Sequence, residues 1–160
     1  MKFIKDLLPY VIIILVVVLI RIFLVTPIRV MGSSMYPTLS SKDIMILNKV
    51  SKIDRFDIVV ISSDKSSDIL IKRVIGLPGE TIEIKDDQIM INGKVLKEKF
   101  GRGTTSDYPL TIIPKNEYFV LGDNRPISAD SRLFGTFNKK EIKGTTRLVI
   151  FPFKSFGFVK

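Results

Sequence analysis

The chain contains no cysteine and no histidine, and these two absences limit the chemistry that it can perform. Without cysteine it has no disulfides, no thiolate metal sites and no thiol nucleophile. Without histidine it lacks the commonest metal ligand and the usual general base. We therefore expect no metal and no cofactor. Any hydrolytic reaction has to use hydroxyl, carboxylate, amine or backbone groups.

Acidic charge is also scarce, because 16 Asp and Glu face 25 Lys and Arg, for a net charge of +9. Such a balance is typical of proteins that bind nucleic acid, an anionic membrane or an acidic cell envelope. No expected helix gathers Arg for base recognition, and no aromatic and basic motif of the RNA-binding kind is present. We therefore predict no nucleic-acid partner and favour a membrane or envelope setting.

One long apolar run, "LLPYVIIILVVVLIRIFLVT", occupies residues 7–26. Twenty helical residues span about 30 Å, which matches the core of a bilayer. The charge of Arg21 can reach the interface on its long side chain. Lys2 and Lys5 precede the run and predict a cytoplasmic N-terminus. A cleavable secretory signal is the alternative, but "RIFLVTP" supplies no small residues of the A-x-A type, so we favour an uncleaved signal-anchor.

The predicted organisation is therefore a cytoplasmic tip and membrane anchor at residues 1–26 and an extracytoplasmic domain at 27–160. Short β-branched runs separated by turns predict a mainly β domain, an antiparallel coiled or barrel-like sheet. "NKKEIKG" resembles a helical turn. The expected strands and the expected meander lie at 44–50, 57–62, 69–75, 81–96, 117–122 and 145–151.

Four phenylalanines, Phe151, Phe153, Phe156 and Phe158, crowd the C-terminal end. Such residues belong to a core or a strand in many proteins. Next to a membrane anchor they can instead dip into the lipid interface. The sequence supports both interpretations.

Two adjacent serines, Ser33 and Ser34 in "RVMGSSMYPTLS", are candidates for a nucleophile. Because histidine is absent, a deprotonated lysine is the remaining strong candidate for the base. Lys72 interrupts the apolar strand "ILIKRVI", where alternation places it on the same face as Leu70 and Val74. Burial there would lower its pKa toward 7–8. The alternative is a lysine at a strand edge whose tip reaches water.

A third stretch, "GDNRPISADSR" at residues 122–132, is a turn-rich loop after an expected strand, and we call it the late loop. Its two Asp and two Arg can pair with one another, and its two Ser can hydrogen-bond an amine. An ordinary charged loop is the alternative. Asp123 and Asp130 also raise the question of a metal, but no further oxygen ligands complete such a site.

Together, "GSSMYPTL", "DIVV", "KRVIGLPGE", "INGK" and "GDNRPISADSR", in this order behind an apolar N-terminus, resemble the bacterial type I signal peptidases. The resemblance runs from the anchor to the C-terminal "FPF" and is closest to the minimal, single-anchor, Gram-positive-like members. It implies a membrane-bound serine endopeptidase that removes signal peptides from secreted preproteins after small residues of the A-x-A type. The implied partners are those signal peptides and the lipid bilayer.

The resemblance implies Ser34 as nucleophile, with its backbone N–H in the oxyanion hole, and Lys72 as general base. It implies that Ser128 hydrogen-bonds the lysine. It further implies that Asp130 with Arg132, and Asp123 with Arg73, hold the loop at residues 122–132 in shape. Matching positions predict that the substrate contacts Ile28, Val30, Met31, Gly32, Met35, Leu39, Leu70 and Ile71. Many members have a hydroxyl residue where this chain has Gly32, so a second oxyanion donor is not evident.

Two other classes compete with this interpretation. A non-catalytic assembly factor derived from the family would be expected to lose at least one of Ser34, Lys72, Ser128 and Asp130, and all four are present. A self-cleaving regulator of the repressor type is cytoplasmic and carries a DNA-binding region, which the membrane run disfavours. General use and a dedicated role, for instance on pilins, are both compatible with the sequence.

Overall fold

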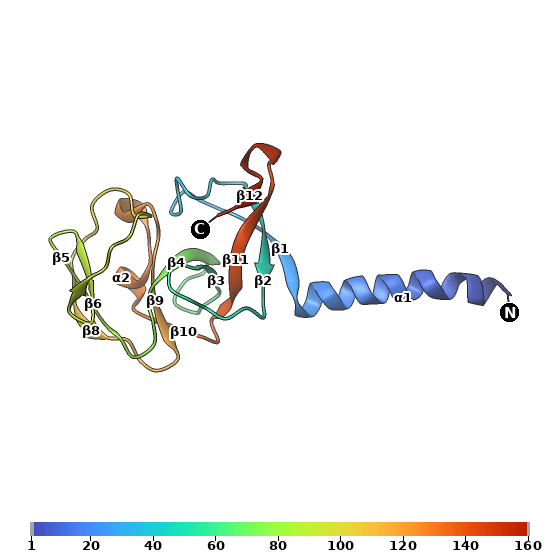
Figure 1. Ribbon diagram of the computed structural model, residues 1–160, viewed down its shortest axis with the longest axis horizontal. Coiled ribbons are helices and arrows are strands. Elements are labelled where there is room, and N and C mark those ends of the chain that lie inside the picture. Colours follow the sequence, from blue (N-terminus) through green and yellow to red (C-terminus); the bar gives the residue numbers. More distant parts are fainter. Residues whose placement is uncertain (1, 160) are drawn as a thin grey trace.

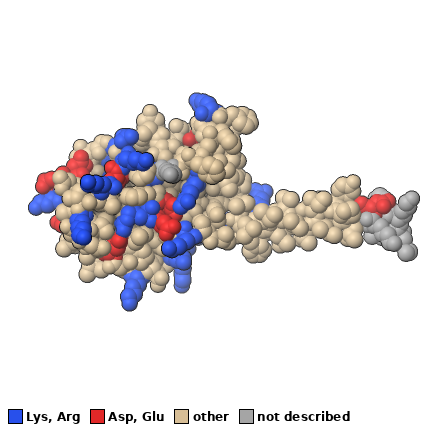
Figure 2. Space-filling model, in the orientation of Figure 1, with Lys and Arg blue, Asp and Glu red and all other residues tan. Residues whose placement is uncertain are grey.

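The computed structural model describes residues 2–159, and the surroundings of side chains from residue 6 onward. The side chains of Lys2 and Lys5, on which the predicted orientation depends, lie outside that range. Helix α1 (Lys2–Phe23) stands away from the rest of the chain (Figure 1), and most of its surface is uncharged (Figure 2). Its residues 6–23 are long and apolar enough to cross a membrane, and none of that span is buried. The helix ends at Phe23 rather than at Thr26, because the next residues form a strand.

The larger sheet has eight antiparallel strands and curls into a half-barrel (Figure 1), so the prediction of a mainly β, barrel-like domain is confirmed. Register shifts in β11 break the regular ladder, and such irregularities let a sheet bend. The order across the sheet is β1 (Val25–Arg29), β2 (Ile44–Asn48), β11 (Ile142–Phe151), β3 (Ile58–Ile61), β4 (Leu70–Gly76), β9 (Glu117–Leu121) and β10 (Phe137–Asn138), with β12 (Gly157–Phe158) on β11.

The smaller sheet contains the predicted meander. It is formed by β7 (Lys94–Val95), β6 (Gln88–Ile91), β5 (Thr81–Lys85) and β8 (Tyr108–Ile112), in that order. Both expected turns are present, at Asp86-Asp87 and Asn92-Gly93, and all four residues have positive φ. The long loop between β7 and β8 leads back toward the larger sheet (Figure 1).

Three short elements differ from expectation. The helical turn expected at 138–144 is wrong, because a turn there leads directly into β11 at Ile142. The helical turn lies earlier instead, as α2 (Ser131–Phe134), where Asp130 caps the helix by accepting from the N–H of Arg132. Two 3-10 turns, η1 (Arg125–Ile127) and η2 (Phe153–Ser155), complete the fold.

The core has three apolar clusters, one on each face of β3 and β4 and one against the smaller sheet. The first includes Met35 and Leu39 from the loop between β1 and β2, so this loop is fastened to the domain. The C-terminal phenylalanines are not part of the core, because their exposed fractions run from 48% to 83%. The interpretation of those residues as core is therefore wrong, but Phe151 and Phe158 do lie in strands, β11 and β12.

Candidate active site

Ser34 lies in the loop that joins β1 to β2. Met35, directly after it, is 2% exposed, so the backbone at Ser34 is held against the core. Gly32 has φ +82°, a conformation that side chains rarely adopt, and it turns the chain into the loop. Ser33 is exposed, whereas Ser34 is half-buried. The two adjacent serines therefore occupy different environments.

Lys72 lies in the middle of β4, directly opposite Val59 of β3. Its neighbours on the same face, Leu70 and Val74, belong to one apolar cluster with Val59. Lys72 itself is 3% exposed, so its tip does not reach water as a strand-edge lysine would. Its Nζ donates a hydrogen bond of 2.7 Å to Oγ of Ser34. The structure thus brings together the two residues singled out for a nucleophile and a base.

Burial lowers the pKa of Lys72 from its ordinary value of 10.5 to about 8. Desolvation is the largest cause, because an ammonium loses more hydration energy than a neutral amine when it is buried. Asp130 and Asp123 raise the pKa, and Arg132 lowers it, so the late loop tunes the value. A neutral amine within hydrogen-bond reach of a serine hydroxyl can accept its proton.

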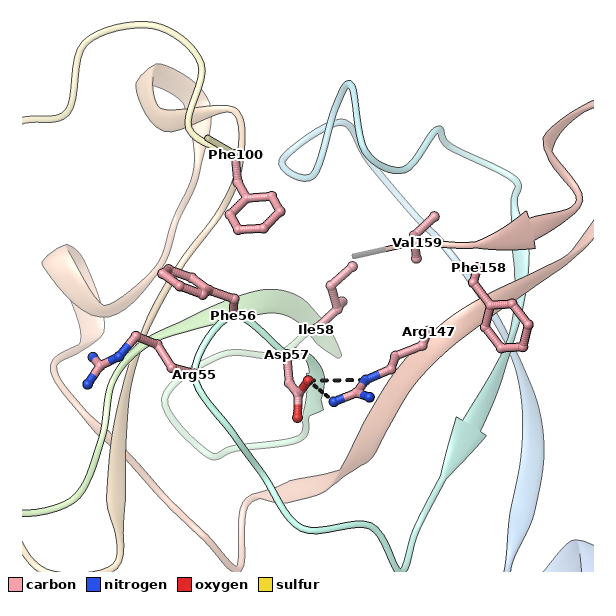
Figure 3. A pocket seen from close by; sticks show the side chains of 8 residues that line it. All are labelled: Arg55, Phe56, Asp57, Ile58, Phe100, Arg147, Phe158 and Val159. Atoms are coloured by element: carbon pink, nitrogen blue, oxygen red, sulfur yellow. Dashed lines mark hydrogen bonds and ion pairs between the residues drawn. The ribbon is translucent and has the colours of Figure 1, made fainter. Parts of the chain in front are cut away.

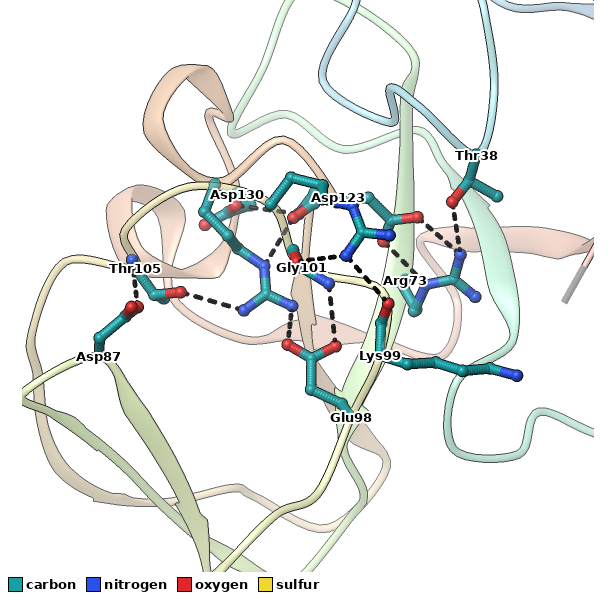
Figure 4. Close-up of polar contacts among 12 residues, drawn as sticks. Thr38, Arg73, Asp87, Glu98, Lys99, Gly101, Thr105, Asp123 and Asp130 are labelled. Carbon is teal, nitrogen blue, oxygen red and sulfur yellow. Dashed lines mark hydrogen bonds and ion pairs between the residues drawn. The ribbon is translucent and has the colours of Figure 1, made fainter.

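Arg73, the next residue on β4, points to the opposite face and is fully buried. Its guanidinium forms two hydrogen bonds with Asp123, Nε to Oδ1 at 2.8 Å and Nη2 to Oδ2 at 2.6 Å. It also donates to the carbonyl of Phe56 at 2.9 Å. Figure 4 shows its further bond to Oγ1 of Thr38, at 3.4 Å. Because Thr38 belongs to the Ser34 loop, this arginine links that loop, β4 and the late loop.

The late loop packs against Ser34 through its backbone. The N–H of Asn124 donates to the carbonyl oxygen of Ser34 at 2.9 Å. Asp130 is fully buried, accepts from the N–H of Gly122 at 3.0 Å, and is paired with Arg132 at 2.9 Å. Both acidic residues singled out in this loop therefore hold its shape by ion pairing.

The expected hydrogen bond between Ser128 and Lys72 is not formed, because Oγ of Ser128 has no hydrogen-bond partner among the described residues. Ser128 packs closely against Gly122. A Cβ added at Gly122 would clash with the Oγ of Ser128 and would lie 2.6 Å from the carbonyl oxygen of Ser34, so only glycine fits at this position. Sequence reasoning missed Gly122. The signal was available, because a glycine follows a buried strand directly at the start of a polar loop.

A groove of about 730 Å³ opens beside Ser34 and Lys72. Five of the residues predicted to contact substrate line it, namely Ile28, Met31, Gly32, Leu70 and Ile71. The other three, Val30, Met35 and Leu39, are 1% to 2% exposed and lie in the core beneath it. Further lining residues are Arg29, Leu47, Val60, Ser67, Asp68, Ile69 and Lys143. The lining is mainly apolar and includes the charged residues Arg29, Asp68 and Lys143.

A second cavity, of about 410 Å³, is lined by Phe56, Ile58, Phe100 and Val159 together with the ion pair of Asp57 and Arg147 (Figure 3). Its remaining lining residues are Arg55 and Phe158. No serine, threonine or lysine is among them, so this cavity offers no nucleophile and base.

Comparison with known proteins agrees with the geometry. The chain matches the profile of a family described as signal peptidase, peptidase S26, over residues 3–151. Signal peptidase I of Bacillus amyloliquefaciens is 44% identical over 151 residues, which cover 84% of this chain and 78% of that protein. Signal peptidase I S of Bacillus subtilis strain 168 is 41% identical over 160 residues, which cover 89% and 86%. The crystal structure of signal peptidase I from Enterococcus faecalis V583 is 37% identical, with a TM-score of 0.54, and covers 60% of this chain and 97% of that one.

Proposed function

The chain belongs to the signal peptidase family, peptidase S26, and from that premise we propose that it cleaves signal peptides from preproteins with Ser34 as nucleophile and Lys72 as general base. It is a serine peptidase, as its relatives are. The observation that carries the assignment of roles is the 2.7 Å hydrogen bond between Nζ of a buried lysine and Oγ of a half-buried serine. The lowered pKa of Lys72, about 8, makes this amine a usable base near neutral pH.

In the proposed mechanism, neutral Lys72 accepts the proton of Ser34 while Oγ attacks the scissile carbonyl carbon. The resulting ammonium then gives that proton to the leaving amine as the peptide bond breaks, which leaves an acyl-enzyme. In the second half, Lys72 takes a proton from water, the hydroxide attacks the ester, and the signal peptide leaves with a new carboxylate. Ser34 recovers its proton from Lys72, so no cofactor is consumed.

The developing oxyanion needs hydrogen-bond donors. The backbone N–H of Ser34 donates to no acceptor in the part of the chain that the structure describes, so it is free for this role. Gly32 provides no side-chain donor, and its φ of +82° disfavours any residue that would. We propose the Ser34 N–H as the main donor, completed by water or another backbone group.

We propose that the substrate binds as an added strand along the groove. Pairing of β4 with β9 begins at Arg73, so within residues 2–159 the preceding residues, Leu70 to Lys72, have a free edge on that side. An extended peptide can pair with such an edge through its backbone. The apolar groove wall at Ile28, Leu70 and Ile71 then accepts small side chains, as A-x-A cleavage requires. The ion pairs Asp130–Arg132 and Asp123–Arg73 hold the late loop beside Lys72.

For the cell, we propose that residues 1–26 anchor the protein in the cytoplasmic membrane, with residues 27–160 on the outer face. Nζ of Lys49 donates to the carbonyl oxygen of Ile22 at 2.8 Å, and this bond joins the end of α1 to the domain. The exposed phenylalanines of β11, η2 and β12 supply apolar surface for contact with lipid.

The decisive experiment is cleavage of a preprotein bearing an A-x-A site by the full-length enzyme in detergent. Ser34→Ala is expected to abolish cleavage, whereas Ser33→Ala, the matched control one residue away, keeps most of it. Equal loss from both variants would overturn the choice of nucleophile.

A panel of preproteins separates general from dedicated use. A general enzyme cleaves most members that carry A-x-A sites, and a dedicated one cleaves a single group, such as pilins, and spares the rest.

A further inference from the structure

A short segment outside the larger sheet, Glu98–Gly101, contacts both sides of the candidate active site. It follows β7 of the smaller sheet and runs beneath the late loop (Figure 4). We propose that Glu98 and Phe100 are positioning residues, and that this segment keeps Ser34 and Lys72 in their relative positions by binding two buried arginines, Arg125 and Arg73. The proposal deepens the proposed function and rests on it.

Glu98 grips the late loop through Arg125, which is 2% exposed. The Arg125 guanidinium donates to Oε1 of Glu98, to Oγ1 of Thr105 at 3.1 Å, and through Nε to the carbonyl oxygen of Gly122 at 2.9 Å. The second oxygen of Glu98 accepts from the N–H of Gly101 at 3.3 Å, so the carboxylate itself is oriented. The buried cation thus joins the smaller sheet to the backbone at Gly122.

Gly122 is the point at which this grip reaches the chemistry. A Cβ there would lie 2.6 Å from the Ser34 carbonyl oxygen and closer still to Ser128 Oγ. Both peptide units that flank the Cα of Gly122 are held, the first through its N–H by Asp130 and the second through its carbonyl by Arg125. We therefore expect a shift of Arg125 to move Gly122 against the backbone of Ser34.

Phe100 grips the other side of the site through Arg73. Its ring centroid is 3.8 Å from the Arg73 guanidinium carbon, within the range of a cation–π contact. The ring of Phe56 lies 5.3 Å from it, centroid to centroid, and Figure 3 shows both rings at the edge of the second cavity. Because Arg73 follows Lys72 on β4, stacking on Arg73 restrains the strand that carries the amine.

Backbone hydrogen bonds extend the same contact. The N–H of Arg102 donates to the carbonyl of Asp123 at 2.7 Å, and the N–H of Arg125 donates back to the carbonyl of Arg102 at 3.0 Å. The loop between β7 and β8 therefore pairs with the loop beside the candidate active site. Through it, the smaller sheet has a role in the geometry of the reaction.

The test measures kcat and KM against pH for the full-length enzyme in detergent, with an A-x-A preprotein as substrate. Glu98→Gln keeps the side-chain shape but removes the charge paired with Arg125. A displacement of about 1 Å in a reacting pair lowers a rate about 10²-fold, so we expect kcat to fall by about that factor while KM changes little. Glu83→Gln, the same change on β5, is the matched control and should leave kcat unchanged.

The pH profile distinguishes positioning from simple loss of folded enzyme. The charged groups that act on Lys72, namely Asp130, Arg132 and Asp123, all belong to the late loop. If that loop loosens, Lys72 gains hydration, and because desolvation is the largest cause of its lowered pKa, this gain outweighs the loss of the two carboxylates that raise the pKa. The pKa of Lys72 then rises, and the acid limb of the kcat profile moves to higher pH in Glu98→Gln. Unfolding alone lowers the amplitude without moving the limb.

If Glu98→Gln is unstable, Phe100→Leu tests the proposal instead, because leucine retains apolar volume and removes only the stacking on Arg73. We expect a loss in kcat of about fivefold, restored by Phe100→Tyr. Wild-type kcat and an unmoved acid limb in both Glu98→Gln and Phe100→Leu would overturn the proposal. An inactive wild-type enzyme would instead refute the proposed function itself.

Discussion

Lys72 and Arg73 are consecutive residues of β4, and both are buried basic side chains. They point to opposite faces of the strand and have different kinds of partner there. Arg73 meets Asp123 in a bidentate ion pair. Lys72 meets the neutral hydroxyl of Ser34 and shares its face of β4 with apolar side chains.

The difference follows from the acid strength of the two groups. A guanidinium keeps its proton in proteins, so a buried arginine needs a carboxylate partner. An amine can lose its proton, so a buried lysine without a directly bonded carboxylate relieves its desolvation by becoming neutral. One face of β4 therefore fixes structure, and the other creates a base.

Removing the amine should have the largest effect. Lys72→Met is expected to lower kcat by about 10⁴-fold, because the general base is lost. Its melting temperature should equal or exceed that of the wild type, since an apolar side chain replaces a buried amine. Lys85→Met, on an exposed position of β5, is the control. If Lys72→Met kept a tenth of the activity, the lysine would not be the base.

Removing the carboxylate on the other face should damage stability instead. Asp123→Asn leaves Arg73 buried without its counter-charge, and we expect the free energy of unfolding to fall by about 3–5 kcal/mol. Chemical denaturation measures this loss. Asp54→Asn, which breaks an exposed pair with Lys52, should change little. Equal effects from the two variants would show that Arg73 is stabilised by something other than Asp123.

The pH dependence of stability should separate the two faces further. The pKa of Lys72 is about 8 in the folded protein and 10.5 when unperturbed, so between these values the unfolded chain binds more protons. The contribution of Lys72 to stability therefore rises as pH increases from 8 to 10.5, by about 3 kcal/mol in total, and Lys72→Met lacks this contribution. Denaturation curves of both proteins across this window measure the difference. Parallel curves would contradict a lowered pKa for Lys72.

The smallest effect concerns Ser128, whose Oγ is unpaired among the described residues. Ser128→Ala should leave stability within about 0.5 kcal/mol, because no hydrogen bond is broken. If the hydroxyl turns to accept from the Lys72 ammonium during the reaction, kcat falls about tenfold, as expected for one hydrogen bond to a charged group. An unchanged kcat would remove Ser128 from the support of the lysine.

The sequence predicted the parts of the fold that local pattern determines. Alternation and two turn signals predicted the meander of the smaller sheet, and alternation alone placed Lys72 on an apolar face. β1 was missed because it continues the apolar run of the anchor and contains Pro27. β8 was missed because it contains Pro109 and follows directly after the polar residues 101–107, so the stretch resembles a loop. The turn at 138–144 has a helical composition, but its residues pair in the sheet.

The site was predictable where a motif carries it and not where tertiary contact does. Family resemblance singled out Ser34, and burial on a strand supported Lys72. Nothing in the local sequence indicates that Glu98 meets Arg125, because the two are 27 residues apart and belong to different parts of the fold. Such contacts become visible only when both loops are placed in space.

The burial of Lys72 also means that the chemistry does not exist until the chain has folded. At pH 7 a lysine with its ordinary pKa is neutral in about 3 molecules in 10⁴, whereas one with a pKa of about 8 is neutral in about a tenth. Completing β4 and its apolar neighbours therefore raises the concentration of active base about 300-fold. With the proposed roles of Ser34 and Lys72, the unfolded chain carries a serine and an ordinary lysine but no active base, and folding is the step that creates one.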